Sequence, residues 1–161
     1  MLRQPFMAAL CTTTMNDVKF KFDTPEHGWM DISVGDGERE ESLVISDVPC
    51  NSVYKLAYIL LALQSGSKSE EVEFSLEPDY ALWKFRANDN ELEIHVFPSS
   101  SRNNPIVFKG QRTKVIHRLY KALRDLETLS CWKEPDATSI IWSWEFPYQE
   151  LNQFRARAKS A

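Results

Sequence analysis

The stretch NSVYKLAYILLALQSG, residues 51–66, decides the fold because the hydrophobic pattern changes its period there. Apolar side chains occupy nearly every position in its middle, which predicts a helix that is buried on most sides. Asn51 or Ser52 can cap the start of this helix, and Ser65-Gly66 is a typical end. On both sides of it, apolar and polar residues alternate with the period of two that is typical of β-strands.

The residues before this helix predict three antiparallel strands that follow one another as a meander. Apolar and polar side chains alternate over residues 18–23 and 30–34, and residues 43–45 supply the return strand. The dipeptide Asp36-Gly37 lies between the second and third runs, where glycine accepts the positive φ of a tight hairpin turn. We expect these strands to pair with their neighbours in chain order.

A second meander follows the helix. Its predicted strands cover residues 72–76, 80–86 and 91–96, and residues 106–108 can add an edge strand. An amphipathic helix is then predicted over 111–129, because one helical face carries an apolar stripe and the opposite face is basic. The remaining elements are a short final strand at 140–144 and a terminal helix over 148–158, which Pro147 opens.

This element order predicts a single α+β domain. Strands joined by tight turns pair antiparallel, and long helices cover one face of the sheet. We therefore expect a two-layer sandwich with a largely antiparallel sheet of six to seven strands, two long helices and a short C-terminal helix. The domain is expected to cover residues 17–161, with residues 1–16 as a flexible N-terminal extension, and 161 residues are enough for one sizeable core.

Cysteine usage and hydropathy favour a cytoplasmic protein. Cys11, Cys50 and Cys131 are odd in number and form no Cys-x-x-Cys pair, so they predict free thiols in a reducing compartment. No run approaches the roughly 20 apolar residues of a membrane span. We expect no contact with a membrane.

The chain contains none of the motifs that mark a catalytic or cofactor site. It has no glycine-rich phosphate loop and no G-x-S-x-G elbow, and no two of its three histidines have metal-ligand spacing. We therefore predict no cofactor, no metal and no catalytic residue, and expect that the protein is not an enzyme. One alternative is a small enzyme or ligand-binding domain with a pocket near His27 and Trp29. Another is a structural subunit of an oligomer.

Charge is distributed unevenly along the chain, whose net charge is -4. Residues 17–47 are strongly acidic, whereas residues 102–124 are basic. The overall acidity and the lack of aromatic residues among the basic ones argue against nucleic-acid binding. An acidic hairpin is suited to docking a basic protein, because complementary charge accelerates encounter. The predicted partner-binding residues are Asp31, Asp36, Glu38, Glu40 and Glu41.

Three short segments carry a resemblance to small bacterial domains. They are His27-Gly28-Trp29 after an alternating strand, the segment from Trp83 to Ile94, and Trp144-Glu145-Phe146-Pro147 near the end. In size, acidity and architecture the chain resembles the immunity proteins of bacterial polymorphic-toxin and contact-dependent inhibition systems. The resemblance implies an immunity or antitoxin protein that binds a cognate toxin, with a basic nuclease-type domain as the expected partner.

Overall fold

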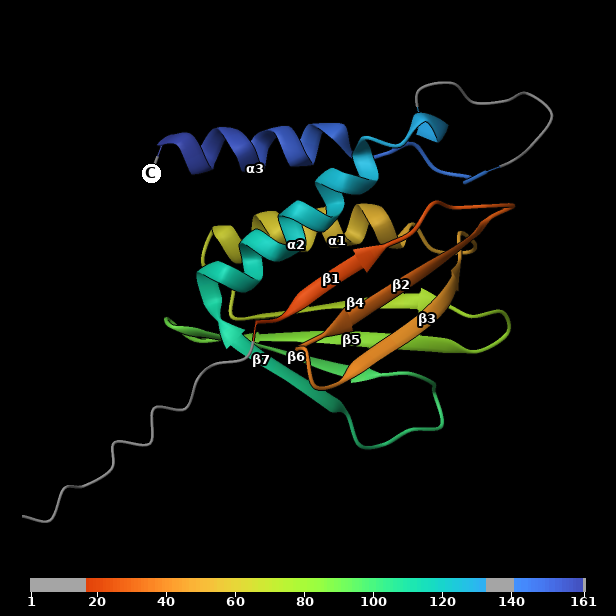
Figure 1. Cartoon of the computed structure of the whole chain (residues 1–161), viewed down its shortest axis with the longest axis horizontal. Coiled ribbons are helices and arrows are strands. Elements are labelled where there is room, and N and C mark those ends of the chain that lie inside the picture. Colours follow the sequence, from red (N-terminus) through yellow and green to blue (C-terminus); the bar gives the residue numbers. More distant parts are fainter. Residues whose placement is uncertain (1–16, 133–140, 161) are drawn as a thin grey trace, which may run out of the picture.

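The structure, a computed structural model, describes residues 17–132 and 141–160 (Figure 1). Its single sheet has seven antiparallel strands that pair in chain order. The strands are β1 (Lys19–Phe22), β2 (Trp29–Gly35), β3 (Glu40–Ser46), β4 (Ser69–Ser75), β5 (Tyr80–Ala87), β6 (Glu91–Phe97) and β7 (Ile106–Gln111). The two predicted meanders and the α+β class are confirmed, because the alternating residues do place one set of side chains in the core.

The sheet is curled so strongly that its first half packs against its second half. The rings of Phe20 on β1 and Trp83 on β5 lie 6.0 Å apart, whereas four strand spacings in a flat sheet would separate these strands by about 19 Å. Strands β3 and β4 share one residue pair, Ser46 with Ser75. Figure 1 accordingly shows β1, β2 and β3 crossing in front of β4 to β6. We call β1–β3 and β4–β7 the two half-sheets.

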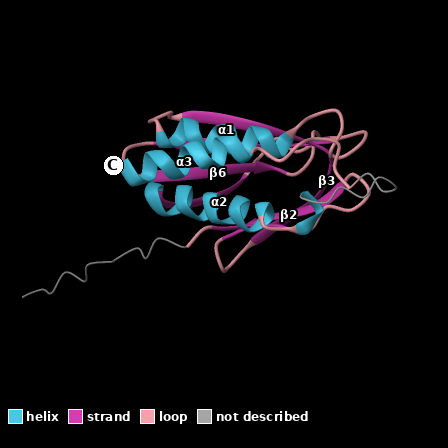
Figure 2. Ribbon diagram, turned by 90° about the horizontal axis from the view of Figure 1, so that it is seen from above, coloured by secondary structure: helices cyan, strands magenta, loops and turns pink. Residues whose placement is uncertain are grey.

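Three helices close the open side of this curled sheet. They are α1 (Ser52–Gln64), α2 (Arg112–Glu127) and α3 (Tyr148–Ser160), and a 3-10 turn, η1 (Ser130–Trp132), follows α2. Seen from above, α3 lies over α1 and α2 and between them (Figure 2). The nearly continuous apolar character of α1 is explained by this position, since α1 packs against β4, α2 and α3.

The terminal helix is held by a few specific contacts. Phe154 stacks on Tyr120 of α2 with ring centroids 4.8 Å apart, and Gln64 of α1 donates a hydrogen bond of 2.9 Å to the Phe154 carbonyl. Arg155 donates to the Tyr120 hydroxyl at 2.8 Å. These contacts bind α3 to both of the helices beneath it.

The cap of α1 and the β2–β3 hairpin agree with the sequence pattern, but the predicted strand at 140–144 is wrong over its described residues. Asn51 caps α1 by accepting a hydrogen bond from the Tyr54 amide at 3.2 Å. The β2–β3 hairpin predicted at Asp36-Gly37 is confirmed; its loop covers residues 36–39, and Gly37 has a positive φ of 87°. Residues 141–144 form no strand, because their polar groups bind the loops beside β2 and β3 and make no ladder.

Two further predictions concern the ends of the predicted elements and contact with a membrane. The predicted N-terminal extension and Ile140 lie outside the described residues. Among the helices that the structure describes, none has both the length and the apolar character needed to cross a bilayer.

Candidate functional site

The predicted acidic residues lie together on the β2–β3 hairpin, residues 29–46, which we call the acidic hairpin. Asp31 on β2 and Glu40 on β3 are exposed on the outer face of the sheet, the face turned away from the helices. Glu38 is exposed in the connecting loop. Glu41 alternates with Glu40 and is partly buried at the opposite face. The structure thus brings these carboxylates onto one hairpin but not onto one face.

Asp36 shapes the loop of this hairpin. Its side chain is only 5% exposed, and its Oδ1 accepts hydrogen bonds from the amides of Glu38, at 3.0 Å, and Arg39, at 2.9 Å. Its other oxygen lies 3.5 Å from the Arg39 guanidinium. A buried carboxylate with these partners organises the turn and offers little surface to another protein.

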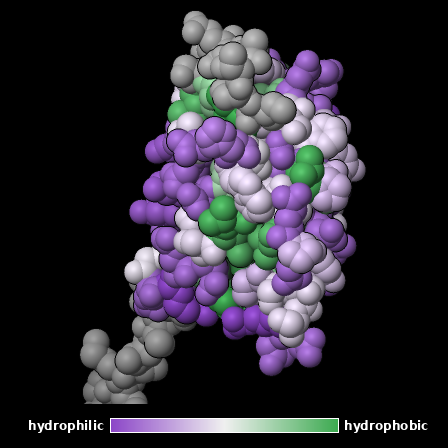
Figure 3. Space-filling model, turned by 90° about the vertical axis from the view of Figure 1, so that its right-hand side faces the viewer, coloured by the Kyte–Doolittle hydropathy of each residue, from purple (hydrophilic) through white to green (hydrophobic). Residues whose placement is uncertain are grey.

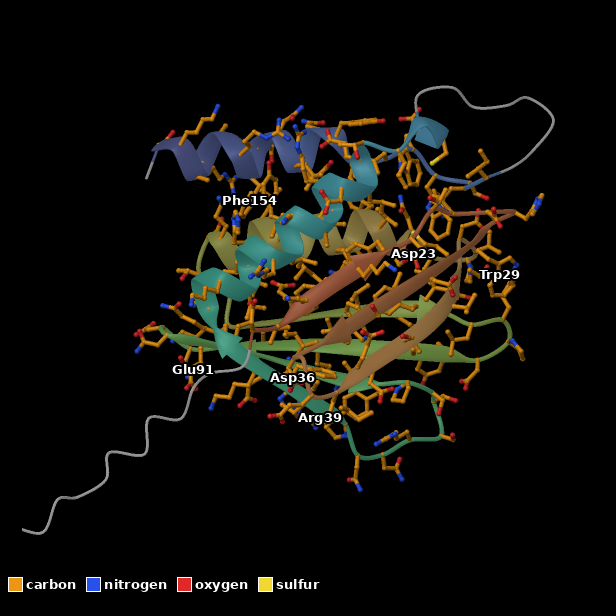
Figure 4. The ribbon with its side chains drawn as sticks, viewed as in Figure 1. Asp23, Trp29, Asp36, Arg39, Glu91 and Phe154 are labelled. Atoms are coloured by element: carbon orange, nitrogen blue, oxygen red, sulfur yellow. The ribbon has the colours of Figure 1, made fainter. Side chains whose placement is uncertain are left out.

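Arg39, the one cation of the acidic hairpin, is directed toward the other half-sheet. It donates a 2.6 Å hydrogen bond to the Val107 carbonyl on β7, and its guanidinium lies 5.2 Å from the centre of the Phe108 ring. Figure 4 labels Asp36 and Arg39 side by side at the tip of the hairpin. The tip is therefore anchored to β7, and Arg39 is drawn away from the carboxylates of the outer face.

The first half-sheet keeps an excess of negative charge after its ion pairs are counted. Lys21 pairs with Asp23 at 3.2 Å, and Arg39 pairs with Asp36. Lys19 is then the remaining cation. Within the described chain no ion pair includes the four carboxylates Asp31, Glu38, Glu40 and Glu41.

The segment around His27 and Trp29 forms a junction between loops. His27 is exposed and adopts a positive φ of 50°. Gly28 follows with φ 80°, and its amide donates to the Ile141 carbonyl at 3.0 Å. A Cβ at Gly28 would lie 2.9 Å from Asp47 Oδ1, so this position requires glycine for space as well as for conformation.

Asp47 is the central residue of this junction, and the sequence analysis missed it. Its carboxylate is buried and accepts a 2.6 Å hydrogen bond from the Ser143 amide, while its carbonyl accepts the Trp144 indole N–H at 2.5 Å. Its amide donates to the Gly28 carbonyl at 2.9 Å. Gly28 and Asp47 directly precede and follow the paired residues Trp29 and Ser46, so their pairing could have been inferred from the predicted hairpin. No local pattern indicated that Ser143 would bind Asp47.

Four exposed apolar side chains surround this junction, and we call them the apolar patch. They are Trp29 at 37%, Val44 at 53%, Val48 at 41% and Trp144 at 38% of full exposure. Figure 3 views this end of the molecule, where apolar residues gather in the middle of a hydrophilic surface, and Figure 4 places Trp29 there. Trp29 pairs with Ser46 and Asp31 pairs with Val44, so the patch adjoins the acidic hairpin.

The pocket predicted near His27 and Trp29 stays a prediction, and the three depressions described below lie elsewhere on the surface. A shallow depression lies beside β1 and the hairpin loop, where Lys19, Ser33, Glu38 and Glu40 line it. Two other depressions are lined by α1 with α3 and by Asp17 with the start of α2. His27 and Trp29 line none of these three.

The thiols of Cys50 and Cys131 are not set up for nucleophilic chemistry. Burial, and to a lesser degree the Glu73 carboxylate, raises the pKa of the Cys50 thiol, and burial raises that of Cys131. A raised pKa lowers the thiolate fraction, so neither thiol is activated as a nucleophile. No group of three metal-ligating side chains occurs in the part of the chain that the structure describes.

Several basic residues of α2 serve the fold. Arg118 binds Asp17 through two hydrogen bonds of 3.1 and 2.6 Å. Arg112 donates to the carbonyls of Asn88 and Leu63, at 2.9 and 2.8 Å, and so joins α2 to the end of α1. Part of the basic stretch seen in the sequence is therefore used inside the domain.

Comparison with protein-family models, with curated proteins and with solved structures found no match to this chain.

Proposed function

We propose that this protein is an immunity or antitoxin protein that binds a basic toxin domain through the acidic hairpin. The observation that carries the proposal is the set of four carboxylates that make no ion pair within the described chain, on a hairpin whose arginine is engaged elsewhere. Unpaired charge of one sign on a rigid element attracts a partner of the opposite sign. Asp36 contributes by shaping the loop that presents Glu38 and Glu40.

The apolar patch supplies the second requirement of a protein interface. Stable interfaces combine a few aromatic or apolar anchors with a charged rim. Trp29 and Trp144 are such anchors, and the hydrogen bonds of Asp47 restrain the loops that present them. The loss of side-chain freedom on binding is then smaller than for a mobile loop.

A nuclease-type toxin is the partner class that fits this chemistry. An enzyme that binds nucleic acid presents lysine and arginine side chains to the phosphates. A protein with an unpaired acidic face can occupy that basic surface and exclude the substrate. In this proposal the protein acts in the cytoplasm and holds its partner without performing chemistry itself.

The test is a titration against the toxin domain encoded beside this protein's gene, with inhibition of the toxin as a second readout. The triple variant Glu38→Gln, Glu40→Gln, Glu41→Gln is expected to slow association about tenfold or more and to reduce its salt dependence. The matched control is Glu71→Gln, Glu73→Gln, two exposed acidic residues on β4 of the other half-sheet. Equal association rates for the two variants would exclude the acidic hairpin as the docking surface.

A further inference from the structure

Strand β3 has a free hydrogen-bonding edge on the side away from β2. It meets β4 at a single residue pair, Ser46 with Ser75, so the rest of β3 has no neighbouring strand on that side in the described chain. Glu40, Ser42 and Val44 are exposed along this stretch. A strand edge of this kind presents N–H and C=O groups that can pair with another chain.

The backbone groups that face this edge follow from the register. In an antiparallel pair, successive residues alternate between bonding to the neighbouring strand and pointing away from it. The Asp47 amide donates to the Gly28 carbonyl. Every second residue before Asp47, namely Ile45, Leu43 and Glu41, therefore directs its backbone N–H and C=O groups toward β2. Glu40, Ser42 and Val44 therefore direct their N–H and C=O groups outward, and no other described residue accepts from or donates to these groups.

The two outer strands of the sheet are closed in a different way. Arg39 caps the outward carbonyl of Val107 on β7, and α2 packs against β1, which has only four residues. The edge of β3 lacks both devices. It differs also in charge, because Asp31, Glu38, Glu40 and Glu41 lie around it and make no ion pair with a described residue.

We infer that the β3 edge receives an extended segment of a partner protein as an additional strand of the sheet. Main-chain hydrogen bonds to Ser42 and Val44 supply the pairing, as in other complexes formed by strand addition. The surrounding carboxylates select a segment with basic side chains on the face of Glu40, alternating with apolar side chains on the face of Leu43. This inference rests on the proposed function for the identity of the partner, but the edge itself is tested separately.

The probe is an acetylated and amidated hexapeptide of alternating lysine and valine, titrated into the ¹⁵N-labelled protein. In the free protein the amides of Ser42 and Val44 should exchange rapidly with solvent, whereas those of Leu43 and Ile45 should be protected by their bonds to β2. The peptide is expected to slow exchange at Ser42 and Val44. Unchanged exchange at both residues with about 1 mM peptide would overturn the inference.

Two variants of one residue separate strand pairing from charge attraction. Ser42→Pro removes both the side-chain hydroxyl and the outward N–H, while leaving the hydrogen bonds between β3 and β2 intact. Ser42→Ala also removes the hydroxyl but keeps the N–H. The first should weaken peptide binding about tenfold, and the second should leave it within about twofold. Circular dichroism verifies that Ser42→Pro folds; if it does not fold, the exchange measurement on the unmodified protein decides.

The remaining outcomes distinguish this inference from the proposed function. Equal binding by Ser42→Pro and Ser42→Ala, with weaker binding by the triple glutamine variant, would overturn strand addition and leave charge-steered docking in place. Sedimentation of the free protein as a dimer that Ser42→Pro dissociates would also overturn the inference, because a second copy would then occupy the edge. If the toxin domain does not bind but the peptide does, a toxin is excluded as the partner and strand addition at the β3 edge still holds.

Discussion

The acidic hairpin and the strand pair β6–β7 are both rich in charged residues on their outer faces, but only β6–β7 pairs its carboxylates with bases of its own. On β6 and β7, Lys109 lies 2.8 Å from Glu91, and His95 lies 2.8 Å from Glu93. The contact with Glu91 raises the pKa of Lys109. On the acidic hairpin, by contrast, the outer-face carboxylates have no cationic partner among the described residues.

This difference shows that charge composition alone does not tell which carboxylates make ion pairs. Acidic residues are frequent in both half-sheets, and the alternating pattern exposes them in each. The register decides which of them meet a base on the neighbouring strand. The pairing of β6 with β7 therefore brings Glu91 beside Lys109, whereas the pairing of β2 with β3 brings no base beside Asp31 or Glu40.

The largest effect should come from the residue that joins the half-sheets. Trp83 is fully buried and contacts Phe20 of β1 and Phe74 of β4, with ring centroids 6.0 and 4.9 Å apart. Trp83→Ala should lower the free energy of unfolding by about 3–5 kcal/mol in urea denaturation, in a single transition. Trp29→Ala, at an exposed tryptophan, is the control and should cost about 1 kcal/mol or less. Two separate transitions would show that the half-sheets unfold independently.

An intermediate effect should distinguish the two ends of the acidic hairpin. Gly28 and Gly37 both have positive φ, 80° and 87°, but only at Gly28 would a Cβ meet another residue within 4 Å. Gly37→Ala should cost about 1–2 kcal/mol for the backbone conformation alone. Gly28→Ala should cost at least about 1 kcal/mol more, because the new methyl group displaces the Asp47 carboxylate. Thermal and urea unfolding measure the difference, and equal losses would mean that the Asp47 junction contributes little.

The smallest effect tests the charge comparison directly. Glu93→Gln removes the carboxylate that lies 4.0 Å from Lys109 and is hydrogen-bonded to His95, and it should destabilise the protein by roughly 0.5 kcal/mol, since these groups are partly exposed. Glu40→Gln should change the stability by less than about 0.3 kcal/mol, because Glu40 has no ion pair to lose. Added salt should narrow the gap between the two variants. A larger loss for Glu40→Gln would reveal a compensating cation and would contradict the comparison.

Local patterns predicted the elements with small errors at their ends. The helix expected over 111–129 spans Arg112–Glu127, and the edge strand expected at 106–108 spans Ile106–Gln111. Alternation and helical spacing depend on neighbouring residues, so a single sequence contains the information. The predicted strand at 140–144 was wrong over its described residues because Ile141 and Ser143 bind distant loops. The spacing of apolar residues contains no information about partners that are far away in the sequence.

The candidate site divides in the same way. The sequence indicated an acidic hairpin and a loop with glycine and tryptophan, but it treated Asp36 as equivalent to Glu38 and Glu40. The structure shows that their roles differ, since the Asp36 carboxylate accepts hydrogen bonds from the amides of its own loop. Asp47 went unnoticed because a buried carboxylate and an exposed one look alike in a sequence; the partners at residues 143 and 144 make the difference.

The amino-acid sequence determines the period of each segment, the order of strands and helices and the total charge, all of which depend on near neighbours along the chain. The curl of the sheet, the anchoring of Arg39 on β7 and the free edge of β3 are tertiary properties. They arise when surfaces that are far apart in the sequence must pack densely in one core, and an alternating pattern constrains only which face of a strand is buried.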